Sequence, residues 1–160
     1  MATEFNTCGG SHLAKKSALV RARAKLGLLR DVLVIEDETP DAERLIATLR
    51  VIFGYDLQIH WAPTLGEAVD RVLESKPRLV FLDDILKPST DALQSIPLLR
   101  GAGYAGPIIV VSGQVTHSRR RGLLANGASD VIHKDEVDSV RVAEAIARPD
   151  IEGHSQRSVG

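Results

Sequence analysis

The segment Asp31-Val-Leu-Val-Ile-Glu-Asp37 joins a short apolar run to two carboxylates at its end. Its β-branched residues do not alternate with polar ones, which indicates a strand buried on both faces of a sheet. Thr39 as a cap, Pro40 in the first turn and an apolar face at spacings of three and four then predict a helix that ends at Gly54. A buried strand followed by an amphipathic helix is typical of α/β proteins.

The same alternation continues along the chain. Apolar runs predict further strands at 57–61, 79–82, 107–111 and 130–133. Helices are expected after the capping box Thr64-Leu-Gly-Glu67, at 90–100 with Pro97 kinking or restarting it, at 116–126, and from Val137 to Ile146. Five such units predict the α/β class: a (βα)5 doubly wound, three-layer sandwich with a five-stranded parallel sheet in the flavodoxin-like order 2-1-3-4-5.

Length and composition fit one domain with extensions. The chain has 160 residues and a net charge of −1, which gives no electrostatic reason to expect nucleic acid or an anionic membrane as partner. We expect a basic extension at 1–30, helical over about 13–29 and serving as a docking or dimerisation arm, a domain at 31–147, and a tail at 148–160. The lone Cys8 and the lack of a long apolar run favour a cytoplasmic location.

Polar side chains interrupt the pattern where strands end. The carboxyl ends of parallel strands share one edge of the sheet, so these side chains should converge on one pocket. They are Glu36, Asp37, Asp83, Asp84, Ser112 and Lys134. Clustered carboxylates repel one another and favour a hard divalent ion such as Mg²⁺. An aspartate can also act as a nucleophile toward phosphorus, with a metal, a lysine and a hydroxyl neutralising the transferred group.

Four blocks of the sequence resemble the signature blocks of the response-regulator receiver (CheY-like) family, in the order in which that family has them. They are Ile35-Glu-Asp-Glu38, Leu82-Asp-Asp-Ile-Leu-Lys-Pro88, Val110-Val-Ser-Gly113 and Gly127-Ala-Ser-Asp-Val-Ile-His-Lys134. In that family the phosphoacceptor lies four residues before a proline, so Pro88 selects Asp84 over Asp83. Because neighbouring strand residues point to opposite faces, Asp83 would lie away from the site.

The resemblance also implies the other roles at the site. Asp37 would bind Mg²⁺ directly, Glu36 through water, and Asp84 and the backbone carbonyl of Leu86 would complete the protein ligands. Ser112 and Lys134 would hold the phosphoryl oxygens, and Ser112 would move on phosphorylation. The phosphodonor would be a histidine kinase or a histidine phosphotransfer protein, and the domain would assist its own phosphorylation and hydrolysis without being a multiple-turnover enzyme.

Two departures from the family keep an alternative open. Val131 stands where many receivers carry an aromatic switch residue, and Asp135 stands where proline is common. The alternative is a degenerate receiver that serves as an unphosphorylated scaffold, dimeric through the fourth helix, fifth strand and fifth helix. A haloacid-dehalogenase-type hydrolase is disfavoured because its first strand would end in Asp-x-Asp. Too few residues follow Arg148 for a DNA-binding module, so a stand-alone receiver without DNA or membrane contacts is expected.

Overall fold

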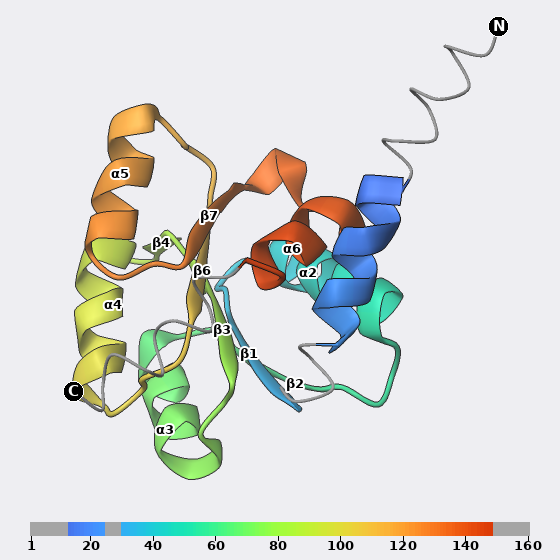
Figure 1. Ribbon diagram of the computed structural model, residues 1–160. Coiled ribbons are helices and arrows are strands. Elements are labelled where there is room, and N and C mark those ends of the chain that lie inside the picture. The colour runs from blue at the N-terminus through green and yellow to red at the C-terminus, as the bar shows by residue number, and fades with distance from the viewer. Residues whose placement is uncertain (1–12, 25–29, 149–160) are drawn as a thin grey trace, which may run out of the picture.

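A computed structural model of the chain describes residues 13–24 and 30–148. Its centre is a five-stranded parallel sheet in the order β2-β1-β3-β6-β7. Helices α2 and α6 cover one face of the sheet, and α3, α4 and α5 cover the other (Figure 1). The predicted three-layer sandwich is thereby confirmed. The strand order is confirmed as well: β4 and β5 form a separate small ribbon, so β6 and β7 are the fourth and fifth strands of the predicted order 2-1-3-4-5.

The bounds of the elements follow the predicted alternation closely. The strands are β1 Asp31–Ile35, β2 Gln58–Ala62, β3 Leu79–Asp83, β4 Ile85–Leu86, β5 Thr90–Asp91, β6 Ile108–Ser112 and β7 Asp130–His133. The helices are α2 Thr39–Phe53, α3 Leu65–Ser75, α4 Ala92–Gly101, α5 His117–Ala125 and α6 Ser139–Ile146, with the 3₁₀ turn η1 at Lys134–Glu136. The β4-β5 ribbon is the one strand pair in the described part that periodicity did not predict.

The sheet separates two apolar clusters because successive strand residues point to opposite faces. On the side of α2 and α6, Val34 of β1 packs with Phe81 of β3 and Ile132 of β7. On the side of α3, α4 and α5, Leu82 of β3 packs with Val110 of β6. We call these two sides the α2/α6 face and the α3/α4/α5 face. This division decides which polar residues meet at the strand ends.

Side chains cap most of the helices at their first residues. Thr64 accepts a hydrogen bond from the amide of Glu67, as the capping box predicts. Thr116 caps α5 in the same way. The predicted cap at Thr39 was wrong: Thr39 is the first helical residue of α2, and Glu38 precedes it without a side-chain cap. Pro40 needs no amide donor at this position, so the helix start remains unstrained.

Pro97 lies inside α4 without dividing it. A residue at this position would normally donate its amide to the carbonyl of Leu93, and proline cannot. The side-chain amide of Asn126, which follows α5, donates to that carbonyl at 3.0 Å. The predicted restart of the helix at Pro97 does not occur, since α4 runs unbroken over Ala92–Gly101, and the Ser95 hydroxyl donates to the carbonyl of Asp91 one turn back.

The basic extension contributes a helix that packs on the domain itself. Residues 13–24 are helical, and Figure 1 shows this helix beside α2 and α6. Ala22 is fully buried in the core on the α2/α6 face, and the Arg23 guanidinium donates to the carbonyl of Ile52 at 2.7 Å. Residues 25–29 of the predicted helix lie outside the described residues. The N-terminal helix therefore contributes to the core on the α2/α6 face, and the domain boundary at residue 30 stays a prediction.

The ends of β1, β3, β6 and β7 meet at one edge of the sheet, and the β4-β5 ribbon lies directly after β3. The register pairs Asp83 with Val111 and Ser112 with His133. Polar residues that are distant in sequence are thereby brought together at this edge. Among the described helices, none has the length and apolar character needed to cross a membrane.

Candidate functional site

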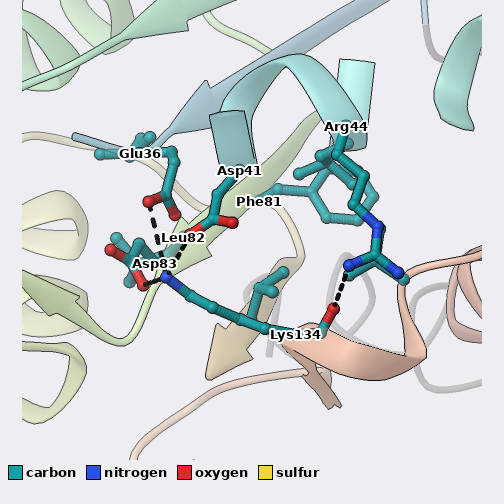
Figure 2. Close-up of a pocket in the computed structure, with 11 residues that line it drawn as sticks. Glu36, Asp41, Arg44, Phe81, Leu82, Asp83 and Lys134 are labelled. Atoms are coloured by element: carbon teal, nitrogen blue, oxygen red, sulfur yellow. Dashed lines mark hydrogen bonds and ion pairs between the residues drawn. The ribbon is translucent and has the colours of Figure 1, made fainter. Parts of the chain in front are cut away.

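An acid cluster forms where β1 and β3 end. Each of Glu36, Asp37 and Asp83 offers a carboxylate oxygen, and these atoms lie within 4.8 Å of one another. The ammonium of Lys134, which follows β7, is 3.6 Å from Glu36 Oε1 and 3.3 Å from Asp83 Oδ1. Figure 2 shows the Lys134 side chain reaching between these carboxylates from the opposite wall. Three of the predicted site residues and Asp83 therefore converge.

In this cluster the positive charge of Lys134 does not balance the negative charge of the carboxylates. Burial, with the nearby Asp83 carboxylate, raises the pKa of Glu36 to about 8. Burial likewise raises the pKa of Asp83 to about 6, although Lys134 opposes the shift. For Lys134, burial alone would lower the pKa, but its carboxylate neighbours raise it above the ordinary value. A divalent cation would relieve the repulsion among these carboxylates.

One oxygen of the cluster has no partner. Asp37 Oδ1 is buried and makes no hydrogen bond, whereas Asp37 Oδ2 accepts the backbone amide of Lys87 at 3.2 Å. A buried carboxylate oxygen without a partner is costly unless a cation binds it. Hard oxygen ligands of this kind are those that Mg²⁺ prefers. The donor set therefore fits the predicted metal, with Glu36, Asp37 and Asp83 as the carboxylates that would hold it.

Asp84 has different surroundings from its neighbour. It accepts the Ser112 hydroxyl at 2.7 Å and the amide of Ala92 at 3.4 Å. The Arg119 guanidinium binds both of its oxygens, with Nε 3.1 Å from Oδ2 and Nη2 on Oδ1. Burial alone would raise the pKa of Asp84, but Arg119 and Ser112 outweigh it and hold the pKa below its ordinary value. Asp84 is thus an ion-paired carboxylate.

The expected grouping of Asp84 with Glu36 and Asp37 needs correction. Asp83 and Asp84 do point to opposite faces, as strand alternation requires. The residue two positions before Asp83 is Phe81, which belongs to the α2/α6 face, and Glu36 follows Val34 on that same face. Asp83, not Asp84, therefore joins Glu36 and Asp37 in the acid cluster. The spacing to Pro88 selects Asp84, which lies outside this cluster, between the end of β3 and the start of β4. Which of the two aspartates accepts a phosphoryl group stays a prediction.

The other two predicted site residues, Ser112 and Lys134, contact different aspartates. Ser112 contacts Asp84, whereas Lys134 contacts Asp83. Both aspartates nevertheless line one open pocket together with Ser112, Arg119 and Lys134. The metal-binding role of the Leu86 carbonyl stays a prediction. Leu86 pairs with Thr90 in the β4-β5 ribbon, one residue before the amide that contacts Asp37.

Sequence reasoning missed two charged residues at the site. Asp41 lies in the first turn of α2, and its carboxylate is 2.9 Å from the Lys134 ammonium (Figure 2). Its position in the first turn of the helix that directly follows the acidic end of β1 was the available signal. Arg119 lies in the first turn of α5 and binds Asp84. A cation in the first turn of α5, unfavourable to the helix dipole, indicated a partner elsewhere.

Other residues around the site are structural. Arg120 donates to the carbonyl of Val131 and to Asp130, so it also turns inward from α5. Val131, at the position where an aromatic was expected, is 2% exposed on the α3/α4/α5 face. Trp61 of β2 donates its indole N–H to the carbonyl of Glu36 at 2.7 Å, which places the single tryptophan of the chain next to the acid cluster.

Comparison with known proteins identifies the family. The protein-family model of the response regulator receiver domain matches residues 32–147 of the sequence. This is well over half of the chain, and the parallel sheet with acidic strand ends agrees with it. The chain belongs to the response regulator receiver family, the signalling domain of two-component systems, as the four sequence blocks predicted.

Individual relatives are more distant. The response regulator MprA of Mycobacterium tuberculosis is 31% identical over 103 residues, which cover 64% of this chain and 43% of the relative. The chain thus spans less than half the length of these curated relatives. The CheY-like receiver protein of Methanospirillum hungatei is 20% identical with a TM-score of 0.64, covering 81% of this chain and 98% of its own. The structure of NtrX from Brucella abortus is 25% identical with a TM-score of 0.65, and the match covers 81% of this chain and 28% of the NtrX chain.

Proposed function

We propose that this receiver domain accepts a phosphoryl group on an aspartate at the end of β3, in a reaction that depends on Mg²⁺. The observation that carries the proposal is the buried cluster of Glu36, Asp37 and Asp83 with Lys134 at its edge. The geometry favours Asp83 as the acceptor, since of the two aspartates after Leu82 only Asp83 belongs to the acid cluster and pairs with Lys134. The sequence-based choice, Asp84, is already bound by Arg119.

The residues around Asp83 would divide the work of phosphoryl transfer. Mg²⁺, when bound by Glu36, Asp37 and Asp83, supplies positive charge that neutralises the phosphoryl oxygens. Lys134 would hold a phosphoryl oxygen, and its contact with Asp41 keeps the ammonium close to that place. Ser112 would donate its hydroxyl to another oxygen of the group. These fixed donors stabilise the charge of the transferred group without reorganisation.

The expected donor is a histidine kinase or a histidine phosphotransfer protein, as the family implies. Transfer moves the phosphoryl group from a histidine nitrogen to a carboxylate oxygen, and hydrolysis later returns the carboxylate and releases phosphate. Changed contacts on the α5, β7 and α6 side would then pass the signal to a protein partner. A second copy of the chain bound through that side stays a prediction.

Phosphorylation by acetyl phosphate tests this function. Intact-protein mass, measured with Mg²⁺ or with a chelator, should show one added phosphoryl group only when Mg²⁺ is present. Hydroxylamine should remove it, since it cleaves acyl phosphates. The variant D83N/D84N is the control and should remain unmodified. A wild-type protein inert under every condition would favour the unphosphorylated scaffold, and modification of the double variant would place the group elsewhere.

Metal binding alone gives a further prediction. Mg²⁺ should change the fluorescence of Trp61, which is 39% exposed and hydrogen-bonded to the backbone of Glu36. The substitution Asp37→Asn removes the charge beside the unpartnered oxygen and should weaken Mg²⁺ binding by at least about tenfold, roughly 1.4 kcal/mol. Asp56→Asn lies outside the cluster and serves as the control. Equal affinities of the two variants would refute the assignment of Asp37 as a ligand.

A further inference from the structure

The Ser112 hydroxyl already donates its hydrogen to another group. A serine hydroxyl has one hydrogen to donate. Its Oγ atom lies 2.7 Å from Asp84 Oδ2 and 3.1 Å from the carbonyl oxygen of Gln114, so the charged and closer Asp84 is the preferred acceptor, and Oγ itself accepts the amide of Gln114 at 3.1 Å. Ser112 is 1% exposed, so water does not compete for the hydrogen. The hydroxyl can therefore donate to a new oxygen only if it releases Asp84.

Arg119 fixes the carboxylate that holds this hydroxyl. Its guanidinium binds both oxygens of Asp84, a planar two-point contact that leaves the carboxylate little freedom. The pair is buried on the Asp84 side, where the carboxylate is 3% exposed. Arg119 is the third residue of α5, so the contact also ties the first turn of that helix to the end of β3.

The place where a phosphoryl group would form is next to this contact. Asp83 precedes Asp84 in the chain, and both line the open pocket that also contains Ser112. A phosphoryl group brings oxygens that need hydrogen-bond donors. The Ser112 hydroxyl is a neutral donor in the lining of that pocket, and Asp84 already accepts its hydrogen.

We propose that Asp84, held by Arg119, competes with a phosphoryl group on Asp83 for the Ser112 hydroxyl and thereby stabilises the unphosphorylated arrangement of α5. This inference rests on the proposed function, and it makes Asp84 and Arg119 positioning residues. Phosphorylation would withdraw the hydroxyl from Asp84 and weaken the contact that ties α5 to β3. The two states then differ in a definite set of contacts, as a switch requires.

Beryllofluoride, which mimics a phosphoryl group on a carboxylate, allows a direct test. It is titrated into the full chain at saturating Mg²⁺, with Trp61 fluorescence as the signal. The substitution Asp84→Asn replaces a charged acceptor by a neutral one, which holds the hydroxyl less strongly. We expect beryllofluoride to bind about tenfold more tightly to this variant, the change that corresponds to about 1.4 kcal/mol.

Two further variants separate competition for the hydroxyl from other effects. In an S112A background, Asp84→Asn should change the affinity by less than about twofold, because no hydroxyl remains to be released. The variant D84N/R119Q removes the charge pair together, so no unpaired guanidinium is left to attract the anion or to destabilise the fold. It should show the same tightening as Asp84→Asn, and circular dichroism checks that each variant is folded.

Each result has a distinct meaning. Tightening that needs Ser112 and persists in the neutral double variant supports the competition. Equal tightening with and without Ser112 would show a charge effect alone and would overturn it. Tight binding to the wild type without any gain in the variants would overturn it while leaving the proposed function intact. Failure of the wild type to bind would remove the proposed function as well, and loss of binding in Asp84→Asn would make Asp84 the acceptor.

Discussion

The substitution Asp83→Asn is expected to abolish Mg²⁺-dependent phosphorylation by acetyl phosphate, whereas Asp84→Asn is expected to retain it. Asp83 is the carboxylate that lies with Glu36 and Asp37 and within 3.3 Å of the Lys134 ammonium. An amide cannot replace a carboxylate as the nucleophile, so the first variant loses the reacting oxygen. Asp84 lies in an ion pair whose loss leaves that oxygen in place. The measurement is intact mass after incubation with the donor.

The two variants are matched controls for each other, because the same chemical change is made at adjacent residues of similar burial. Peptide mapping of the modified wild type, after reduction of the acyl phosphate with borohydride, identifies the residue independently. Loss of phosphorylation in Asp84→Asn with retention in Asp83→Asn would restore the assignment by the spacing to Pro88. Partial modification of both would mean that the two carboxylates can each react.

The second large effect concerns the stability of the fold. Asp130 begins β7, and its side chain is 1% exposed. Guanidinium groups of Arg120, Arg141 and Arg148 lie 2.9, 2.9 and 3.1 Å from it, and its own oxygen accepts the amide of Val131. The carboxylate thus joins α5, α6 and the segment after α6 to the sheet. Its removal would leave three cations facing one another beside the core.

We expect Asp130→Asn to lower the free energy of unfolding by about 2–3 kcal/mol, measured by urea denaturation at neutral pH. Breaking a fully buried ion pair costs about 3–5 kcal/mol, and the partly exposed arginines reduce that cost. The control is Asp135→Asn, whose side chain is 89% exposed and which should cost less than about 0.5 kcal/mol. Equal costs for the two variants would contradict the role of Asp130.

The stability that Asp130 contributes should also change with pH in a definite direction. Burial alone would raise the pKa of Asp130, but Arg141 and Arg120 hold it below the ordinary value of 3.8. A carboxyl group with a lowered pKa in the folded state stabilises the fold above its unfolded pKa and loses this effect as pH falls through the folded pKa. The stability difference between wild type and Asp130→Asn should therefore be constant from neutral pH to about 5 and shrink in stronger acid. A difference that grows toward acid would be inconsistent with this account.

Much of the fold follows from local pattern alone. The apolar runs at 31–35 and 79–82 gave buried strands because a parallel sheet covered on both faces needs apolar residues throughout. Caps such as Thr64 and the helix end at Gly54 depend on neighbouring residues only, so they were predictable as well. The β4-β5 ribbon was not, since two-residue strands carry no periodicity.

The sequence by itself determined the family, the order of the sheet, and the polar residues that end the strands, but not Asp41 and Arg119, which reach the site from helices. It could not decide how those residues pair, because Asp83 and Asp84 are chemically identical neighbours and their spacing to Pro88 depends on where β3 ends. Only the tertiary structure assigned Asp83 to Lys134 and Asp84 to Arg119. The physical reason is that these contacts join residues 35 to 93 positions apart in the chain. Such contacts depend on the face of the sheet to which each side chain points and on the register between strands, and no local sequence pattern contains that information.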